Sequence, residues 1–240
     1  MPTEVVPAGV PGHSKAERVQ AMFARIVPRY DLMNRIMTMG MDRAWRRAAV
    51  RAAAPRDGLA LDVGTGTGDL AFELARGGAR RVVGADFCEE MLVVARLKAQ
   101  RQMPGQALDF VLGDALGLPF PDATFDCVVN GFVLRNVASL PNAFAEMFRV
   151  LRPGGRLVCL EITHPPRSLA PFFSLYFNQV VPRLGAALTG ESAAYQYLPQ
   201  SLGPLPEAHR LAAMIAQAGF GEVRYRRLGL GTVALHVARR

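Results

Sequence analysis

The spacing of hydrophobic residues along the chain predicts strands and helices in regular alternation. Short apolar runs that end in a glycine or an acid predict buried strands, because a strand covered on both faces is hydrophobic throughout. Five such runs occur, at 59–63, 81–86, 108–113, 125–131 and 156–162. Apolar residues at intervals of three and four predict helices between them, at 68–76, 89–101 and 141–151. This order predicts an α/β fold with a parallel sheet.

Helical spacing also occupies both ends of the alternating region. Before the first strand we expect three helices, at 14–26, 30–38 and 41–53. After the fifth strand the alternation stops. There we expect helices at 164–188 and 206–218, followed by two final strands at 221–228 and 232–238.

These elements are expected to form one domain over 14–240, preceded by a lead over 1–13. The lead is rich in proline and glycine and lacks the basic start and apolar stretch of a signal peptide. We therefore expect it to be disordered and the protein to be cytoplasmic. Within the domain, 14–57 is expected to be a helical N-terminal part and 163–205 an insertion that covers the substrate.

The composition is that of a globular protein, with half of the 240 residues hydrophobic and a fifth charged. Its net charge of +8 favours partners that carry phosphate, such as RNA or an anionic membrane surface, although a solvated basic surface is equally compatible. Three cysteines without CxxC spacing predict reduced thiols. No cluster of residues has metal-ligand spacing, so we expect no metal.

The residues after the first predicted strand are typical of a nucleotide-type site. Asp62 is followed by Gly64, Gly66 and Gly68, and a helix begins next. Glycines allow a sharp turn and a close approach of the backbone to a ligand. Two interpretations fit this run. Residues 66–71 match a dinucleotide fingerprint weakly, whereas Asp-x-Gly-x-Gly-x-Gly resembles motif I of the S-adenosylmethionine-dependent methyltransferases.

Two further blocks favour the methyltransferases. The segment 118–126 resembles the connection before strand four in methyltransferases of small molecules, and 149–157 resembles the helix end, Pro-Gly turn and strand that follow. The resemblance implies a Rossmann-like sheet of seven strands, mostly parallel, with an antiparallel final hairpin. It also implies that S-adenosylmethionine is the methyl donor. The residues implied to hold it are Asp62, Gly64, Gly66, Thr67, Gly68, Asp86, Phe87, Asp114, Ala115 and Gly131.

A narrower resemblance covers the chain from about Val19 to His236. The segments that carry it are 29–34, 39–46, 131–137, 160–165, 194–201 and 232–236. They resemble the menaquinone and ubiquinone C-methyltransferases. The resemblance implies methyl transfer to a ring carbon of a prenylated hydroquinone, with demethylmenaquinol as the expected acceptor. A benzoquinol of ubiquinone biosynthesis and another small phenol remain alternatives, because Val133 and Arg35 depart from the family pattern.

Arg135, Tyr30 and Asn136 are the catalytic candidates, and Arg135 is expected to stabilise a phenolate or to order a water that takes its proton. A salt bridge that shapes the loop is the alternative for Arg135, as is helix packing for Tyr30. The residues expected to contact substrate are Asn34, Phe173, Tyr176, Tyr195, Tyr197 and His236. For His236, a satisfied core residue is the alternative.

The apolar stretch 172–181 predicts either a channel for the isoprenoid tail or a surface that rests on the membrane, with ordinary helix packing as the alternative. We therefore expect transient contact with the inner face of the cytoplasmic membrane. A homodimer is left open. An RNA methyltransferase is a rival, but 130–132 lacks the Asn-Pro-Pro-aromatic block of amino-group methylation, so no nucleic acid is expected. A non-catalytic module that binds the donor is a further rival.

Overall fold

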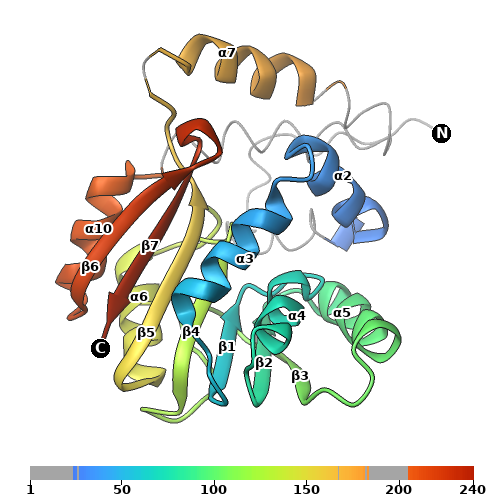
Figure 1. Ribbon diagram of the computed structural model, residues 1–240, viewed down its shortest axis with the longest axis vertical. Coiled ribbons are helices and arrows are strands. Elements are labelled where there is room, and N and C mark those ends of the chain that lie inside the picture. The colour runs from blue at the N-terminus through green and yellow to red at the C-terminus, as the bar shows by residue number, and fades with distance from the viewer. Residues whose placement is uncertain (1–23, 26, 167, 182, 184–204) are drawn as a thin grey trace, which may run out of the picture.

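A computed structural model describes residues 24–25, 27–166, 168–181, 183 and 205–240 (Figure 1). The predicted lead over 1–13, most of the helix predicted at 14–26, and both Tyr195 and Tyr197 lie outside the described residues. The proposed division into an N-terminal helical part and a cover insertion stays a prediction.

Seven strands form one sheet in the order β3-β2-β1-β4-β5-β7-β6. Six run in the same direction, and β7 runs antiparallel to its neighbours β5 and β6. This arrangement confirms the predicted methyltransferase-like sheet. The strands are β1 (Leu59–Val63), β2 (Arg81–Asp86), β3 (Leu108–Leu112), β4 (Phe125–Gly131), β5 (Leu151–Ile162), β6 (Gly221–Leu228) and β7 (Val233–Arg239).

The prediction for the fifth strand was wrong at its start, because β5 begins at Leu151 and not at residue 156. The Pro-Gly-Gly segment, expected to be a turn, forms a bulge within this strand, since Leu151 pairs with Phe125 but Arg156 pairs with Cys127, and Gly154 has φ of +80°. The bulge pairs with the end of the chain. The Gly154 amide donates to the Arg240 carbonyl at 2.7 Å, and the Arg240 amide donates to the Gly155 carbonyl at 3.1 Å. Arg240 therefore provides hydrogen-bond partners for backbone groups of Gly154 and Gly155 that no neighbouring residue in the sequence satisfies.

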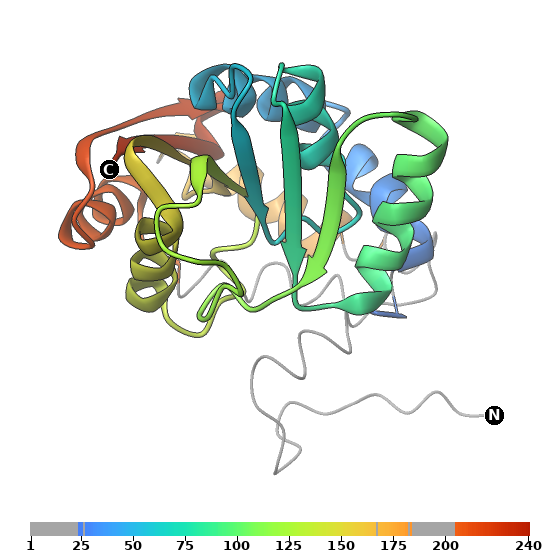
Figure 2. The ribbon, with the colours of Figure 1, turned by 90° about the horizontal axis from the view of Figure 1, so that it is seen from below.

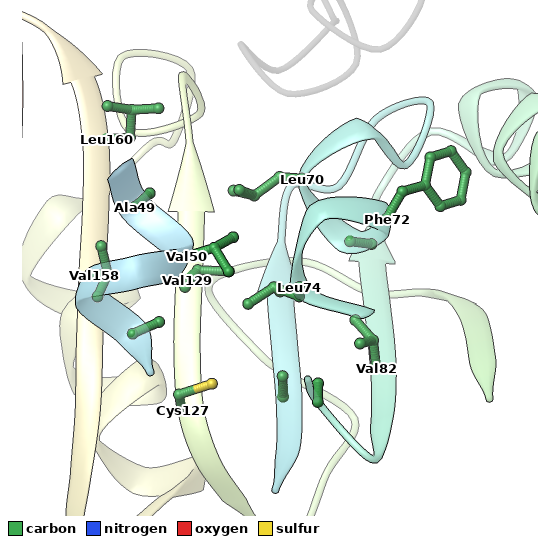
Figure 3. Close-up of a cluster of buried hydrophobic side chains, with 14 of the residues drawn as sticks. Ala49, Val50, Leu70, Phe72, Leu74, Val82, Cys127, Val129, Val158 and Leu160 are labelled. Carbon is green, nitrogen blue, oxygen red and sulfur yellow. The ribbon is translucent and has the colours of Figure 1, made fainter. Parts of the chain in front are cut away.

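Two helical layers cover the sheet, as Figure 2 shows from below. Buried side chains of α3, α4 and α5 pack on one face of the sheet, and those of α6 and α10 on the other. These helices are α3 (Asp42–Ala53), α4 (Asp69–Arg76), α5 (Glu89–Gln102), α6 (Leu140–Val150) and α10 (Ala208–Gln217). Figure 3 shows α3 and α4 filling the first face, with Val50 beside Val129 and with Leu74 between the two helices and the strands.

Shorter helices lie at the carboxyl edge of the sheet, where the parallel strands end (Figure 1). They are η1 (Val27–Arg29), α2 (Tyr30–Met37), α7 (Ala170–Leu175), the π-helical turn η2 (Tyr176–Val180) and the turn η3 (Gly229–Gly231). The helix expected from residue 164 begins only at Ala170, because His164 and Pro165 each precede a proline, and a residue before proline is disfavoured in the helical region. Ligands bind at this edge in open α/β sheets.

We predict that Gly84→Ala destabilises the protein by about 1–3 kcal/mol, because overpacking forces neighbours to shift. A Cβ on Gly84 in β2 would lie 2.7 Å from Thr65 Oγ1 and 2.8 Å from Phe110 Cδ1. Gly117→Ala is the matched control, since nothing lies within 4 Å of a Cβ there. Urea denaturation measures both, and equal midpoints for the two variants would contradict this account.

Candidate active site

A cavity of about 350 Å³ opens at the carboxyl edge of the sheet. Its floor is the turn after β1, and its walls come from α2, the start of α3, the loop after β4, α7 and the tip of the β6–β7 hairpin. Segments far apart in the sequence therefore meet around one space. A cavity of this size suits one small ligand.

The glycine turn is fixed by contacts on both sides. Gly64, Gly66 and Gly68 have φ of +69°, +55° and +89°, which non-glycine residues rarely adopt. A Cβ on Gly64 would lie 2.4 Å from Val133 Cγ2. The Tyr30 ring lies over the turn, with Cε1 3.9 Å from a Cβ built on Gly66. The turn thus presents backbone, without side chains, to the cavity.

Asp62 ends β1 with a carboxylate that lines the cavity and is almost fully buried. Its Oδ2 accepts a hydrogen bond from the Thr65 hydroxyl at 2.8 Å. Within the part of the chain that the structure describes, Oδ1 has no hydrogen-bond partner. Burial, together with the nearby charge of Asp86, raises the pKa of Asp62 to about 7. An unsatisfied, buried carboxylate oxygen in a cavity wall fits a cationic group such as a primary ammonium.

Asp86 ends β2 and holds the turn from behind. Its Oδ2 accepts from the Gly66 amide at 2.7 Å, and its Oδ1 accepts from the Cys88 amide at 3.0 Å. Burial raises the pKa of this carboxyl. The amides of Gly66, Cys88 and Phe87 act against this rise, and Asp86 lines neither of the two cavities. The ribose contact expected of Asp86 stays a prediction.

A second, smaller cavity of about 50 Å³ lies on the other side of Gly64. Phe87, Asp114 and Ala115 line it, together with Asn136 from the loop after β4. Gly64 lines both cavities. A ligand that bends around this glycine would therefore occupy both. The structure places Asn136 here and not beside Arg135 in the larger cavity, which separates two residues that are adjacent in sequence.

Arg135 lines the larger cavity while its guanidinium is held from below. Nη1 donates to the Phe132 carbonyl at 2.7 Å and to Glu161 Oε1 at 2.9 Å. The two side chains are 8% and 1% exposed, so this ion pair is buried. The salt bridge weighed for Arg135 is therefore present, and the residue also lines the cavity. Its action on a phenolate stays a prediction.

Tyr30 and Asn34 lie one turn apart on α2, and both line the cavity. Burial raises the pKa of the Tyr30 phenol, although the hydrogen bond with Asn34 and the charges of Arg135 and Arg46 act in the opposite direction. The phenol therefore stays protonated at neutral pH and can donate a hydrogen bond to a ligand.

Charged residues that the sequence analysis did not single out connect α2 to the rest of the domain. Thr67 Oγ1 donates to Asp31 Oδ1 at 2.6 Å. Lys98 Nζ on α5 donates to Asp31 Oδ2 at 2.7 Å and to Asp69 Oδ1 at 2.6 Å. Arg46 lies 3.7 Å from Asp69 Oδ2 and lines the cavity. Burial raises the pKa of Asp69, but Arg46 and Lys98 outweigh it and lower that pKa overall.

The remaining predicted residues divide into two groups. Phe173 and Tyr176 line the cavity, and the Tyr176 hydroxyl donates to the Met37 carbonyl at 2.9 Å. His236 was expected to contact substrate, but it lines neither cavity. Its Nε2 lies 2.8 Å from the Ala208 carbonyl and its ring stacks on Tyr225, so it is a core residue, which was the alternative. Burial lowers its pKa.

Among the described residues, no group of histidine, cysteine or acidic side chains is arranged to hold a metal ion. In the same part of the chain, no helix is long and apolar enough to cross a membrane.

Solved structures of low sequence identity share the fold. A methyltransferase from Thermotoga maritima, described as S-adenosylmethionine-dependent and as a possible histamine N-methyltransferase, has a TM-score of 0.66 at 19% identity and covers 92% of this chain and 98% of its own. The cyclase SpnF has a TM-score of 0.70 at 19% identity and covers 98% and 99%. At such identity the likeness concerns the fold alone.

Curated relatives are far more similar. Demethylmenaquinone methyltransferase of Roseiflexus castenholzii is 46% identical over 239 residues, which cover 98% of each chain. The protein of that name from Deinococcus radiodurans is 48% identical over 93% of this chain and 92% of its own. A ubiquinone/menaquinone biosynthesis C-methyltransferase of Desulfotalea psychrophila is 43% identical over 93% and 90%.

The family described as the ubiE/COQ5 methyltransferase family matches residues 12–240. The donor therefore is S-adenosylmethionine, in agreement with an unsatisfied carboxylate beside a glycine turn. On the strength of that match and of relatives close to half identical over nearly the whole chain, this protein belongs to the ubiE/COQ5 methyltransferase family.

Proposed function

We propose that this enzyme transfers a methyl group to a ring carbon of a prenylated hydroquinone, and that demethylmenaquinol is the acceptor. The observation that carries this proposal is one apolar cavity whose wall holds both the Asp62 carboxylate and the Arg135 guanidinium. In this proposal Asp62 pairs with the ammonium group of the donor, and Arg135 stabilises a phenolate on the acceptor. The names of relatives that are 46% and 48% identical favour demethylmenaquinol over the benzoquinol of ubiquinone biosynthesis.

The donor supplies a methyl group on a sulfonium, and the sulfur keeps the bonding electron pair when that methyl leaves. In this proposal Asp62 Oδ1 pairs with the α-ammonium of the donor, because it is the buried oxygen without a partner among the described residues. Phe87, Asp114 and Ala115, which line the smaller cavity, would hold the adenine, and Asp86 would accept from the ribose. The backbone of Gly66 allows close approach.

The acceptor carbon becomes nucleophilic when the neighbouring ring hydroxyl loses its proton, which a water ordered at Arg135 takes up. The guanidinium of Arg135 stabilises the phenolate, and Glu161 and the Phe132 carbonyl keep that guanidinium in place. The new bond joins the ring carbon to the methyl carbon, and the ring then loses the hydrogen of that carbon as a proton. Tyr30 and Asn34 close over the ring from α2 and hold it against the donor.

Phe173 and Tyr176 are proposed to contact the acceptor from α7 and η2, where they line the cavity. We also propose that the enzyme is cytoplasmic and visits the inner face of the membrane, where a prenylated quinol resides. A homodimer and the absence of nucleic-acid binding stay predictions.

The proposed function predicts which acceptor gains the methyl group. With labelled S-adenosylmethionine, demethylmenaquinol should acquire label on its ring at a rate at least tenfold above that of the benzoquinol. Reactions without quinol control for methylation of other material. Absence of label from both products would overturn the assignment, and faster labelling of the benzoquinol would reverse the choice of acceptor.

The raised pKa of Asp62 predicts how donor binding depends on pH. Below about pH 7 the free carboxyl is protonated and does not attract an ammonium, and the α-amino group of the donor stays charged over this range. The donor should therefore raise the melting temperature more at pH 7.0 than at pH 5.5.

Asp62→Asn should remove this difference and weaken donor binding at pH 7.0. The same substitution should raise the stability of the unliganded protein at pH 7 and above. Because the pKa of Asp62 is raised in the folded protein, its protonated form stabilises the fold at low pH, and this stabilisation is lost as pH rises through about 7. Asparagine does not titrate, so the variant does not lose stability in this way. Asp122→Asn is the control, because that carboxylate is 74% exposed and lies outside both cavities. A donor-induced shift that is independent of pH in the wild type would contradict the role given to Asp62.

The geometry of Arg135 predicts separate effects on turnover and on donor binding. Arg135→Ala should lower kcat about 100-fold, the usual cost of removing a group that stabilises an oxyanion. Glu161→Gln should lower kcat less, because an amide still accepts from Arg135 but no longer pairs with its charge. Calorimetry should give an unchanged donor affinity for both variants. If donor affinity falls as much as kcat, Arg135 serves the donor site and not the acceptor.

A further inference from the structure

The four most exposed large hydrophobic side chains of the described residues surround the mouth of the active-site cavity. They are Leu230, Met39, Phe172 and Leu175, which are 81%, 74%, 71% and 60% exposed, and we refer to them as the apolar rim. Met39, Phe172 and Leu230 also line the cavity itself. Scattered exposed apolar residues need no explanation, but a cluster around one opening indicates an interaction surface.

The rim comes from three separate parts of the fold at the same edge of the molecule. Met39 lies in the turn between α2 and α3, Phe172 and Leu175 lie on α7, and Leu230 lies at the tip of the β6–β7 hairpin. In Figure 1, α7 lies above the sheet, and the tip of this hairpin and α2 rise toward the same side. No single amphipathic element produces the cluster, so the fold itself assembles it.

The exposure of Leu230 is enforced by the backbone. Its φ is +57°, between Gly229 at +54° and Gly231 at +89°, and leucine rarely adopts this left-handed conformation. A Cβ on Gly229 would lie 2.6 Å from Trp45 Cζ2, and one on Gly231 would lie 2.7 Å from Pro166 Cδ. The two glycines are thus packed onto the domain. The residue between them is left at the apex, with its side chain in solvent.

A second rim residue also has a left-handed backbone. Met39 has φ of +50° and precedes Gly40, whose φ is +74°. Non-glycine residues in strained conformations persist where the surrounding structure over-determines them, and they gather at functional sites. Met39 and Leu230 both have strained backbones, and both expose an apolar side chain beside the same cavity. Folding alone does not explain this arrangement.

The charges around the rim are positive. Exposed arginines lie on the elements that carry it, among them Arg35 on α2 and Arg226 and Arg227 on β6. The acidic residues described in α2, α3 and β6 are Asp31, Asp42 and Glu222, and they face the cations Lys98, Arg46 and Arg239. Apolar tips among exposed arginines match a surface that is anionic outside and apolar within.

The size of the cavity also indicates that a lipid bilayer lies at its mouth. At about 350 Å³, it has to hold the acceptor ring together with the methionine part of the donor. A prenyl tail on that ring must therefore leave through the mouth, past the rim. Each methylene of the tail is more stable in lipid than in water, so the tail remains in the bilayer.

We infer that the apolar rim inserts into the surface of an anionic lipid bilayer and seats the mouth of the cavity on the membrane. The role given to the prenyl tail rests on the proposed function, whereas binding of the apolar rim to lipid requires no substrate. Leu230 and Phe172 enter the acyl boundary, and the surrounding arginines meet the headgroups. The quinol ring then enters the cavity while its tail stays in the membrane.

Flotation of the purified protein with vesicles tests this surface. The wild type should float with vesicles of phosphatidylcholine and phosphatidylglycerol, and less with phosphatidylcholine alone or at high salt. Leu230→Ser should lower the partition coefficient about tenfold, as expected when one leucine no longer leaves water. Arg226→Gln should weaken binding to the anionic vesicles only. Leu112→Ser on β3 is the matched control, since that leucine is 57% exposed, lines neither cavity and lies on the strand at the opposite edge of the sheet from β6.

Three results would overturn the inference: a wild type that does not float, a Leu230→Ser variant that floats as well as the wild type, and a concentration-dependent dimer in ultracentrifugation that Leu230→Ser breaks. The last result would make the rim an interface between two copies of this chain.

Activity measurements separate this inference from the proposed function. Leu175→Ser changes a rim residue that does not line the cavity. It should methylate a quinol with a short, water-soluble tail at the wild-type rate, but lose most of its rate on a long-tailed quinol in vesicles. Unchanged rates on both would count against the rim. Flotation without methylation of any quinol would instead leave the rim intact and overturn the proposed function.

Discussion

The structure depends on how tightly the turn after β1 is packed. Gly64 meets Val133 from the loop after β4, Gly68 meets Phe72 of α4, and Gly84 in β2 meets Thr65, each without room for a Cβ. The turn is thereby fixed from three directions. Its remaining side is bare backbone that faces the cavity, and this constraint places the Asp62 carboxylate at the cavity wall.

Once the turn is fixed, the site divides naturally in two. Gly64 lies between the larger cavity and the smaller one, so a donor with two arms can bend around it. The side that we propose for the acceptor is built separately, by a buried ion pair of Arg135 and Glu161 and by the helix α2. A buried arginine that lost its partner would be costly, which is why Glu161 at the end of β5 belongs to the site although it does not line the cavity.

Local sequence predicted the parts of this fold whose causes are local. The glycine spacing, the apolar runs and the acid at the end of β1 each depend on neighbouring residues, and the strands at 59–63, 81–86 and 125–131 were placed correctly. The network of Lys98 and Asp31 was missed, because its members lie 67 positions apart and meet only in the folded chain. The start of β5 was misplaced for the same reason, since the C-terminus provides its partner.

Residue type alone does not predict the role of a side chain when that role depends on burial. His236 has the chemistry of a base, but register with β5 turns it toward α10, where its Nε2 lies 2.8 Å from the Ala208 carbonyl. Conversely, Arg46 looked like one of many surface arginines and yet is 11% exposed and lines the cavity. Packing between distant segments decides which face of a helix or strand is covered. The spacing of residues along the sequence therefore predicted the burial of neither side chain.

The most direct test of the central role given to Asp62 is the number of protons released when S-adenosylmethionine binds. Calorimetry at pH 6 in buffers of different ionisation enthalpy gives this number. A carboxyl with a pKa of about 7 that must ionise to pair with an ammonium should release about one proton, and Asp62→Asn should release none. Donor binding to the wild type without proton release would contradict the account.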